Sequence, residues 1–553
     1  MASDDVASRD HGTAVLPSTR PTTETESPLK SAVKTDLVKG EELTQDAVQP
    51  TDATRKETIA ADDDSGANAV KGWRLVAILV GVCVGSFLMS VDVFIIATAI
   101  PAITNAFSET SKIAWYAAAY SLTTCAMIPL AGKLASVFPL RWVYQIAFVI
   151  FLVGSVICGA AKGSNLFIFG RAVAGIGAAG IASGGLTVIV TISTPAKRPL
   201  FIGITSSMFA LGVILAPIMG GALTEKVSWR WCFYINLPPG GITLLIMYFF
   251  FRPRRFHADE PIAKRLKRLD IIGALMFVPA SFMLLIAMQW GGTRYPWNSA
   301  TVIGLFVGGG VLTLVFIAWQ WHQGDDALIP GTIVGRRNVA LTCMFSFCFL
   351  GGLAVMSYYL PEWFQAVRGV SPLQSGVRVL PSVITQILAL LVVGAFATKL
   401  GYFNPWTIAG PILMAIAAGL FTTFKAFGTE PKEWIGYQVI QGIGVGITMQ
   451  VPTLITQQNL EGHPMLPIGV SMLLFSQYLG ATVNQVIAGS VFNAYLRSSL
   501  EDRGVSDRQI AQLLAGGTIH VEETAKEYFP DLLEPVLESY NHAITRVYVR
   551  AHE

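Results

Sequence analysis

Two ionisable residues, Asp92 and Arg171, lie inside otherwise apolar stretches of the chain. Asp92 stands between SFLMSV and VFIIATAIP, and Arg171 precedes AVAGIGAAG. A charged side chain at the centre of a membrane helix costs about 2.5–3.5 kcal/mol, so such residues usually have a function. A carboxylate in a low-dielectric environment near a cation can take up and release a proton as its surroundings change. We therefore expect Asp92 and Arg171 to act in proton coupling or gating; the alternative is a fixed ion pair or a helix-end cap.

The composition of the chain indicates that these residues lie in a membrane. Of 553 residues, 52% are hydrophobic and only 14% are charged, whereas soluble proteins have about 25% charged residues. The net charge is +3, and no basic cluster alternates with aromatic residues, which argues against nucleic-acid binding. A water-soluble globule and a nucleic-acid partner are therefore excluded, and the lipid bilayer is the expected surrounding.

Apolar runs of about 20 residues recur with short polar breaks, and each is long enough to cross a hydrocarbon core of about 30 Å. We predict an all-α polytopic membrane protein. The thirteen predicted spans are 74–100, 113–132, 142–161, 166–191, 200–223, 231–251, 270–290, 301–320, 339–361, 377–398, 405–424, 434–456 and 467–495.

Both ends of the chain are polar. The first 70 residues contain 14 acidic and 7 basic residues and no aromatic residue, a composition typical of disorder. After Arg497 the chain is again polar, although DLLEPVLESYNHAITRVYV could form a short helix at a surface. We divide the chain into a disordered cytoplasmic tail, a six-helix half, a basic loop with two extra spans, a second half of five spans, and a polar tail: 1–72, 73–251, 252–338, 339–495 and 496–553.

Lysine and arginine in the loops predict the orientation. A cytoplasmic N-terminus places the larger share of them inside, mainly because the loop that begins at Arg252 is strongly basic. We expect a multi-pass protein of the plasma membrane, with the vacuole or a vesicle membrane as the alternative.

Enzymatic chemistry is not expected. The six cysteines lie in or beside apolar spans without a CxxC pair, and the seven histidines lie outside the spans or at their margins. We therefore predict neither a metal site nor a cofactor, and we interpret the cysteines as packing residues. GIGAAG, from Gly175 to Gly180, matches the dinucleotide pattern GxGxxG, but it lies within a long apolar run, where glycines allow close helix packing.

The same glycine-rich stretch indicates an internal repeat. GRAVAGIGAAG aligns with YQVIQGIGVG, with Gly175 on Gly442, Gly177 on Gly444 and Arg171 on Gln438. A repeat of about half the chain is typical of transporters, whose two halves move against each other around a central site. Only one half carries the charge.

Several motifs make the chain recognisable. ALGVILAPIMGGAL resembles the antiporter motif GxxxGPxxGG of the major facilitator superfamily, with Ala216 where the second glycine is usual, and SWRWCFYINLP is similar to the start of the sixth span in its 14-span fungal drug and toxin efflux branch. VDVFIIATAIP, GKLASVFPLRW, GRAVAGIGAAG and YYLPEWFQAVRGVSPLQSGVRVLP resemble further motifs of that branch. The resemblance assigns proton coupling to Asp92 and Arg171, and conformational change to Gly132, Arg141, Gly175, Gly212, Pro217, Gly220 and Gly221.

The resemblance implies two six-helix halves with two extra central helices, and export of hydrophobic small molecules such as drugs or fungal metabolites in exchange for protons. The proton gradient would be the energy source, no cofactor is implied, and we expect a monomer. Ser136 stands where the superfamily has a gating aspartate, so we do not expect an aspartate-based latch. The tail resembles the last external loop with the final helix lost, so we expect a truncation.

Substrate identity does not follow from the sequence. Polar and aromatic residues inside the spans could line a pocket or bond between helices. The alternatives are a siderophore or other metabolite transporter of the same superfamily and a truncated membrane protein that does not transport. The pocket candidates are Tyr116, Tyr120, Gln386, Gln441, Gln450, Gln477, Tyr478 and Asn484.

Overall fold

Helices make up almost all of the described structure. The computed structural model describes residues 72–107, 109, 112–253, 261–292, 294–400, 404–506, 509–510, 526 and 532–550. Within these residues the only extended pairing is an isolated bridge between Gly291 and Tyr295. The predicted disordered tail, 1–72, lies outside the described residues except for Gly72.

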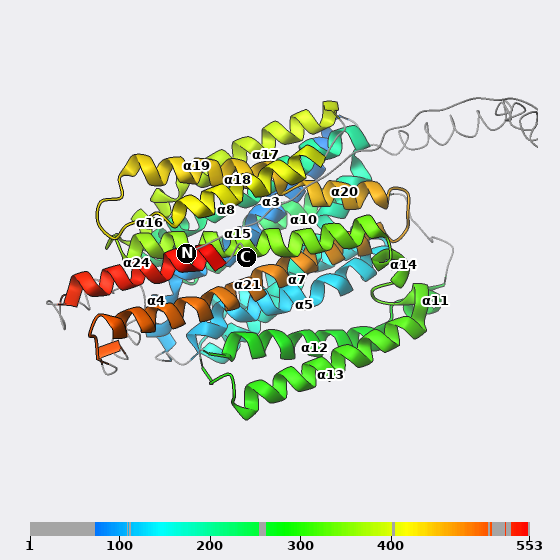
Figure 1. Cartoon of the computed structure of the whole chain (residues 1–553). Helices are drawn as coiled ribbons and strands as arrows, with labels where there is room; N and C mark the ends of the chain where they lie inside the picture. Colours follow the sequence, from blue (N-terminus) through cyan, green and yellow to red (C-terminus); the bar gives the residue numbers. More distant parts are fainter. Residues whose placement is uncertain are drawn as a thin grey trace, which may run out of the picture. The chain divides into compact units, whose positions relative to one another are not determined.

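The first half of the chain is a group of helices that begins with the two consecutive segments α3 and α4 (Figure 1). The predicted first span is divided at Ile95, and the sixth is divided between Tyr234 and Leu237. The helices are α3 (Trp73–Phe94), α4 (Ile96–Phe107), α5 (Ile113–Val137), α6 (Leu140–Ala160), α7 (Ser164–Ile192), η1 (Pro195–Lys197), α8 (Arg198–Lys226), α9 (Trp231–Tyr234) and α10 (Leu237–Phe250).

Two long helices, α12 and α13, follow and pack against each other, and α12 also contacts α5. The central elements are α11 (Ile262–Lys267), α12 (Ile271–Trp290), α13 (Ala300–Gln323), η2 (Gly324–Asp326) and α14 (Gly331–Val334). The second half contains α15 (Arg337–Ala366), α16 (Pro372–Arg378), α17 (Leu380–Leu400), α18 (Asn404–Phe421), α19 (Pro431–Thr448), α20 (Val451–Asn459), α21 (Leu466–Asp502) and α24 (Leu533–Arg550).

All thirteen predicted spans are helical over most of their length. Three are each divided into two helices, at Ile95, before Leu237, and between Thr448 and Val451. Among the described residues, ten helical stretches are long and apolar enough to cross a membrane. Shorter apolar helices are Ile96–Phe107, Leu380–Phe396 and Pro405–Phe421. The all-α membrane fold predicted from the sequence is confirmed.

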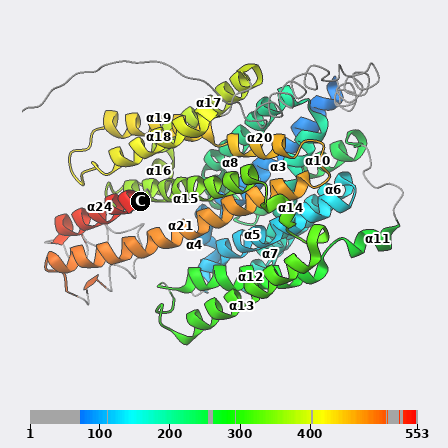
Figure 2. The ribbon, with the colours of Figure 1, turned by 45° about the vertical axis from the view of Figure 1, so that its right-hand side comes forward.

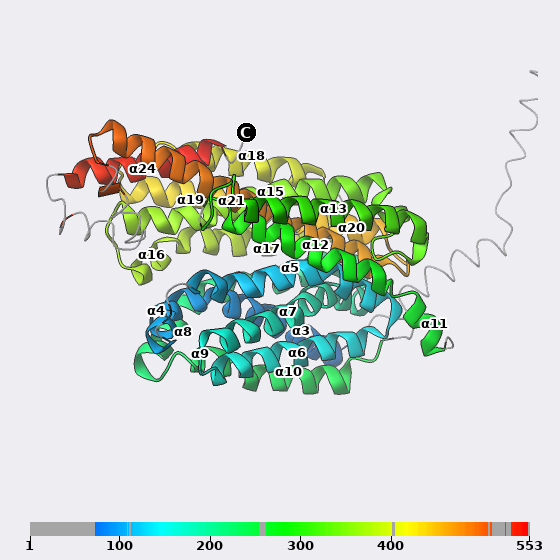
Figure 3. The same ribbon diagram turned by 90° about the horizontal axis from the view of Figure 1, so that it is seen from below.

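The two halves repeat one packing scheme. In the first half α7 packs against α5 and α6, and α3 packs against α8; in the second half α19 packs against α17 and α18, and α15 against α21. The halves meet through two crossed pairs, α5 with α21 and α8 with α17. Figure 3 shows them as two layers, one with α3, α6, α7 and α10 and the other with α15, α18 and α19.

Glycines at aligned positions make the same contacts in both halves. A Cβ at Gly175 would overlap Thr123 of α5, and a Cβ at Gly442 would overlap Thr385 of α17. Close approach of two helix backbones requires small residues at the crossing. The alignment of Gly175 with Gly442 in the sequence therefore corresponds to a repeat in three dimensions.

Helix α24 corrects the prediction for the polar tail, which expected only short surface helices and five helices in the second half. Its side chains Val536, Tyr540, Ile544 and Tyr548 are buried with residues of α15, α18 and α21, and Figure 2 shows α24 beside α21. It contacts the first and third helices of its half, as α10 contacts α3 and α6. The sixth position of the second half is therefore occupied by α24.

We predict that Gly442→Val destabilises the protein, because the new side chain would overlap Thr385 and the backbone of Ser382. Overpacking of a close contact costs about 1–3 kcal/mol. Gly436→Val on the same helix is the matched control, since no atom lies within 4 Å of a Cβ placed there. Thermal unfolding of the purified variants in detergent should show a lower Tm for Gly442→Val alone; equal Tm values would contradict the packing.

Candidate functional site

Asp92 and Arg171 form an ion pair inside the first half. Arg171 Nη1 donates to Asp92 Oδ2 at 2.5 Å, and their side chains are 1% and 0% exposed. Asp92 lies near the end of α3 and Arg171 lies in the first third of α7. A buried ion pair is tolerated only if its remaining donors and acceptors are satisfied, because removing two charges from water costs several kcal/mol per ion.

Helix α5 supplies the other contacts of the cation. Arg171 Nε donates to the carbonyl oxygen of Tyr116 at 3.0 Å, and the guanidinium carbon lies 4.5 Å from the centre of the Tyr120 ring. An aromatic face attracts a cation, more strongly when both are out of water. Two of the pocket candidates thus surround the ion pair.

Asn236 also reaches the carboxylate, and the sequence analysis did not single it out. Its Nδ2 donates to Asp92 Oδ1 at 3.1 Å and to Ser155 Oγ at 3.3 Å, and the residue is fully buried. Asn236 belongs to the motif SWRWCFYINLP, where its position was noted only as part of a resemblance. An amide inside an apolar span was the indication that could have identified it.

The second half has the same hydrogen bond without the charge. Gln438, which aligns with Arg171, donates from Nε2 to the carbonyl oxygen of Arg378 at 3.0 Å. Arg378 lies just before α17, as Tyr116 lies in the first turn of α5. The fourth helix of each half thus donates to a main-chain carbonyl in the first turn of its second helix or just before that helix, but among the described residues only the first half has an ion pair here.

The pocket candidates fall into two groups. The Tyr120 ring lies against the Arg171 guanidinium, and its hydroxyl has no hydrogen-bond partner within the described part of the chain. Tyr116 is occupied, because its hydroxyl is 2.7 Å from Ser164 Oγ. The first group therefore consists of Tyr116 and Tyr120, next to the ion pair, and Tyr478, which lies where α21 packs against α5.

The other candidates belong to the second half and lie apart from the ion pair. Gln386 contacts Met449, and Gln450 donates to the carbonyl oxygen of Leu390. Asn484 donates to Gly480 in its own helix. The first two contacts join neighbouring helices, and the third lies within α21. Gln441 is buried, and its Oε1 has no hydrogen-bond partner among the described residues. Gln477 is half-buried.

The glycines of the antiporter-like motif bring α8 against α3 and α4. A Cβ at Gly212 would overlap Ser90, two residues before Asp92, and a Cβ at Gly220 would overlap Thr98. Pro217 lies inside α8 between them, while a Cβ at Gly221 would meet no atom within 4 Å. The motif therefore packs a helix beside the ion pair.

The end of the bundle at which α3 and α8 begin and α5 ends is closed by contacts between the halves. We call it the basic end, because its residues include Lys133, Arg141, Arg198, Arg252 and Arg336. A Cβ at Gly132 of α5 would overlap Ser471 of α21, and a Cβ at Gly394 of α17 would lie 3.0 Å from the carbonyl oxygen of Pro199 in α8. The two crossed helix pairs thus touch at backbone distance at this end.

Ion pairs and hydrogen bonds reinforce the closed end. Arg198 Nη2 lies 2.9 Å from Glu461 Oε1. Lys133, which is 3% exposed, donates to the carbonyl oxygens of Asp326 at 3.0 Å and Ala327 at 2.7 Å. Ser136, at the position of the superfamily's gating aspartate, donates to Lys133 O in its own helix. Lys133 therefore connects α5 to η2 and Ala327 through two main-chain carbonyl oxygens.

Two further polar residues anchor helices near this end. The carboxylate of Asp270, which begins α12, accepts from the nitrogens of Gly273, Trp319, Gln320 and Leu328 at 2.7–2.9 Å. Arg141 donates to the carbonyl oxygen of Tyr248 and lies over its ring. Asp270 thus joins α12 to α13, and Arg141 joins α6 to α10.

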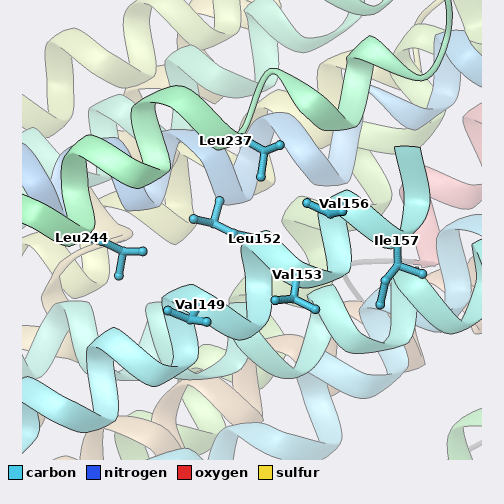
Figure 4. A pocket seen from close by; sticks show the side chains of 7 residues that line it. All are labelled: Val149, Leu152, Val153, Val156, Ile157, Leu237 and Leu244. Carbon is cyan, nitrogen blue, oxygen red and sulfur yellow. The ribbon is translucent and has the colours of Figure 1, made fainter. Parts of the chain in front are cut away.

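A cavity of about 240 Å³ lies between α6 and α10 (Figure 4). Its lining is entirely apolar, and Val149 and Val153 are half-exposed on its rim. It therefore faces the surrounding lipid and is separate from the ion pair. The residues that line it are Val149, Leu152, Val153, Val156, Ile157, Leu237 and Leu244.

Comparison with known proteins identifies relatives over most of the chain. A family model described as Major Facilitator Superfamily matches residues 82–483. The chain is 40% identical over 495 residues to the efflux pump roqT of Penicillium rubens, covering 88% of this chain and 90% of that protein. It is 40% identical over 498 residues to the aspyridones efflux protein of Neocamarosporium betae, covering 89% and 87% of the two chains.

Among solved structures, the proton:xylose symporter XylE matches with a TM-score of 0.57 at 14% identity, covering 86% of this chain and 94% of that chain. At this identity the match supports the fold alone.

We predict that Arg171→Met destabilises the fold by about 3–5 kcal/mol, because it leaves the buried carboxylate of Asp92 without its cation. The double variant Asp92→Asn with Arg171→Met should recover most of this loss, since both charges are then removed. The measurement is thermal unfolding of both single variants and the double variant, combined as a double-mutant cycle. If the double variant instead lost as much unfolding free energy as the two single variants together, the ion pair would make no contribution to stability.

Proposed function

The chain belongs to the Major Facilitator Superfamily, and from this premise we propose that it exports hydrophobic small molecules in exchange for protons. It is a multi-pass membrane transporter. The buried pair of Asp92 and Arg171 carries the proposal, because a carboxylate held beside a fixed cation is a site whose charge a single proton changes. The proton gradient supplies the energy.

Relatives support the class of substrate. The two fungal proteins reported above are an efflux pump and an aspyridones efflux protein. We infer that a hydrophobic secondary metabolite or drug is the cargo and that it contacts Tyr120, whose ring lies against Arg171, and Tyr478 of α21, which packs against α5. We place the basic end and the N-terminus in the cytoplasm of a plasma-membrane protein that works as a monomer.

Transport proceeds by alternating access in this proposal. The closed basic end corresponds to the outward-facing state, in which substrate leaves and Asp92 takes up a proton from outside. Protonation removes the negative charge that balances Arg171 and weakens the contact of α3 with α7. The halves then rock, the basic end opens, and the proton leaves to the cytoplasm as new substrate enters. Each charge moved gains or loses about 2.3 kcal/mol per 100 mV of membrane potential.

We predict that Asp92→Asn abolishes proton-driven export, because an amide side chain does not take up or release a proton near neutral pH. The measurement is accumulation of a fluorescent hydrophobic drug in cells that express the protein, with and without a protonophore. The unmodified protein should lower accumulation only while the gradient lasts.

The matched control is Glu501→Gln, which neutralises an exposed carboxylate at the end of α21 and should export normally. Export by Asp92→Asn at the rate of the unmodified protein would refute the proposed role of the carboxylate.

We predict that Lys133→Met weakens closure of the basic end, because it removes two hydrogen bonds to Asp326 and Ala327. A cysteine placed at Ser471, which is buried against Gly132, reports on opening. Its labelling by a membrane-impermeant maleimide in inside-out vesicles should become several-fold faster in the Lys133→Met background. Lys432→Met, at an exposed lysine in the first turn of α19, is the control; equal labelling rates in both backgrounds would show that Lys133 does not hold the basic end closed.

A further inference from the structure

We propose that Asn236 is a positioning residue for proton uptake: its amide holds the oxygen of Asp92 that receives the proton and passes the change to α6 and α10. This inference rests on the proposed function, in which Asp92 carries the proton. It goes further by assigning a role to a third residue and by naming the atom that is protonated.

The two oxygens of Asp92 have different neighbours. Oδ2 is 2.5 Å from the charged Nη1 of Arg171, whereas Oδ1 accepts a hydrogen bond from the neutral amide of Asn236 at 3.1 Å. A proton on Oδ2 would meet the guanidinium directly, and like charges repel strongly in a low-dielectric interior. The proton from outside therefore forms its O–H bond at Oδ1, which makes the carboxylate a neutral acid while Arg171 remains protonated.

The amide is suited to both states of that oxygen. An ionised oxygen accepts from Nδ2, but a protonated Oδ1 is itself a donor and needs an acceptor. The carbonyl oxygen of Asn236, Oδ1, is buried and has no hydrogen-bond partner among the described residues. Rotation of the amide by half a turn brings this oxygen to the new O–H group, so protonation of Asp92 and rotation of Asn236 favour each other.

The rotation also changes the contacts of two helices. Asn236 immediately precedes α10, and its Nδ2 donates to Ser155 Oγ of α6. The Ser155 hydroxyl donates at present to Phe151 O at 3.1 Å, and after rotation it can donate to the amide oxygen instead. Protonation at α3 is thereby transmitted to α6 and α10.

A purely structural role for Asn236 predicts a different geometry. Asparagine directly before a helix usually caps the first free N–H groups through its side-chain oxygen. Asn236 holds the N-cap position of α10 but makes no such bond. Its side chain points instead to Asp92, which indicates that the carboxylate determines its orientation.

The other charged or titratable groups near Asp92 in the described part of the chain are fixed by their own contacts. Arg171 faces the carboxylate from α7, Tyr120 from α5 and Cys158 from α6. The Cys158 thiol donates to Phe167 O at 3.7 Å, and the Tyr120 ring lies against the guanidinium. Asn236 is the neutral partner whose donor and acceptor can exchange places.

The test is the pH profile of drug export in proteoliposomes that contain the full chain. Asn236→Leu removes the amide from both states of Asp92, but a hydrogen bond to an ionised oxygen is roughly twice as strong as one between neutral groups, so the half-maximal external pH should rise by about one unit. Asn236→Asp has nearly the same shape, which preserves the fold if the leucine variant does not assemble, and its added acid should shift the profile upward still further.

Thr243→Val is the matched control, because Thr243 is buried in α10, two turns after Asn236, and donates to Pro239 O in its own helix; its profile should equal that of the unmodified protein. Unshifted profiles for both Asn236 variants, with a pH-dependent unmodified protein, would overturn this inference and leave the proposed function intact. A flat profile for the unmodified protein would overturn both.

Discussion

The structure of the first half depends on burying one ion pair without leaving it unsatisfied. Asp92 and Arg171 lie where helices α3, α5, α7 and α10 meet, and their side chains have almost no contact with solvent. Each additional contact offsets part of the desolvation cost: the carbonyl of Tyr116, the ring of Tyr120 and the amide of Asn236. The helix positions in this half must provide these partners together, which explains the small residues that let the helices approach.

The two halves share their helix packing but differ in their charged residues. Gln438 and Arg378 reproduce the hydrogen bond of Arg171 with Tyr116, and glycines at aligned positions reproduce the helix crossings. Only the first half adds a carboxylate and a cation to this geometry. In the proposed cycle one proton at Asp92 changes the charge of this site, and the aligned site at Gln438 carries no second ion pair among the described residues.

The sequence identified residues that are unusual in their own helix but not the contacts that those residues make with distant helices. Asp92 and Arg171 were found because charges are rare in apolar helices, but their direct contact involves helices far apart in the chain and could not be inferred from spacing. Asn236 was missed since a neutral amide is a weak indication. Helix α24 was missed because Asn541, His542 and Arg546 interrupt its apolar residues, so its buried face becomes apparent only against α15 and α21.

Helix α8 connects the ion pair to the closed end, and this connection gives the proposed cycle a physical basis. Near its start, Pro199 touches Gly394 of the opposite half, and Gly212 packs on Ser90, two residues from Asp92. A helix has little freedom to stretch along its hydrogen-bonded axis. A small shift of α3 against α7 on protonation would therefore displace α8 as a unit and act on its crossing with α17. Gly212 and Gly220 keep α8 close enough to α3 and α4 for a shift of α3 to be transmitted to α8 by direct contact.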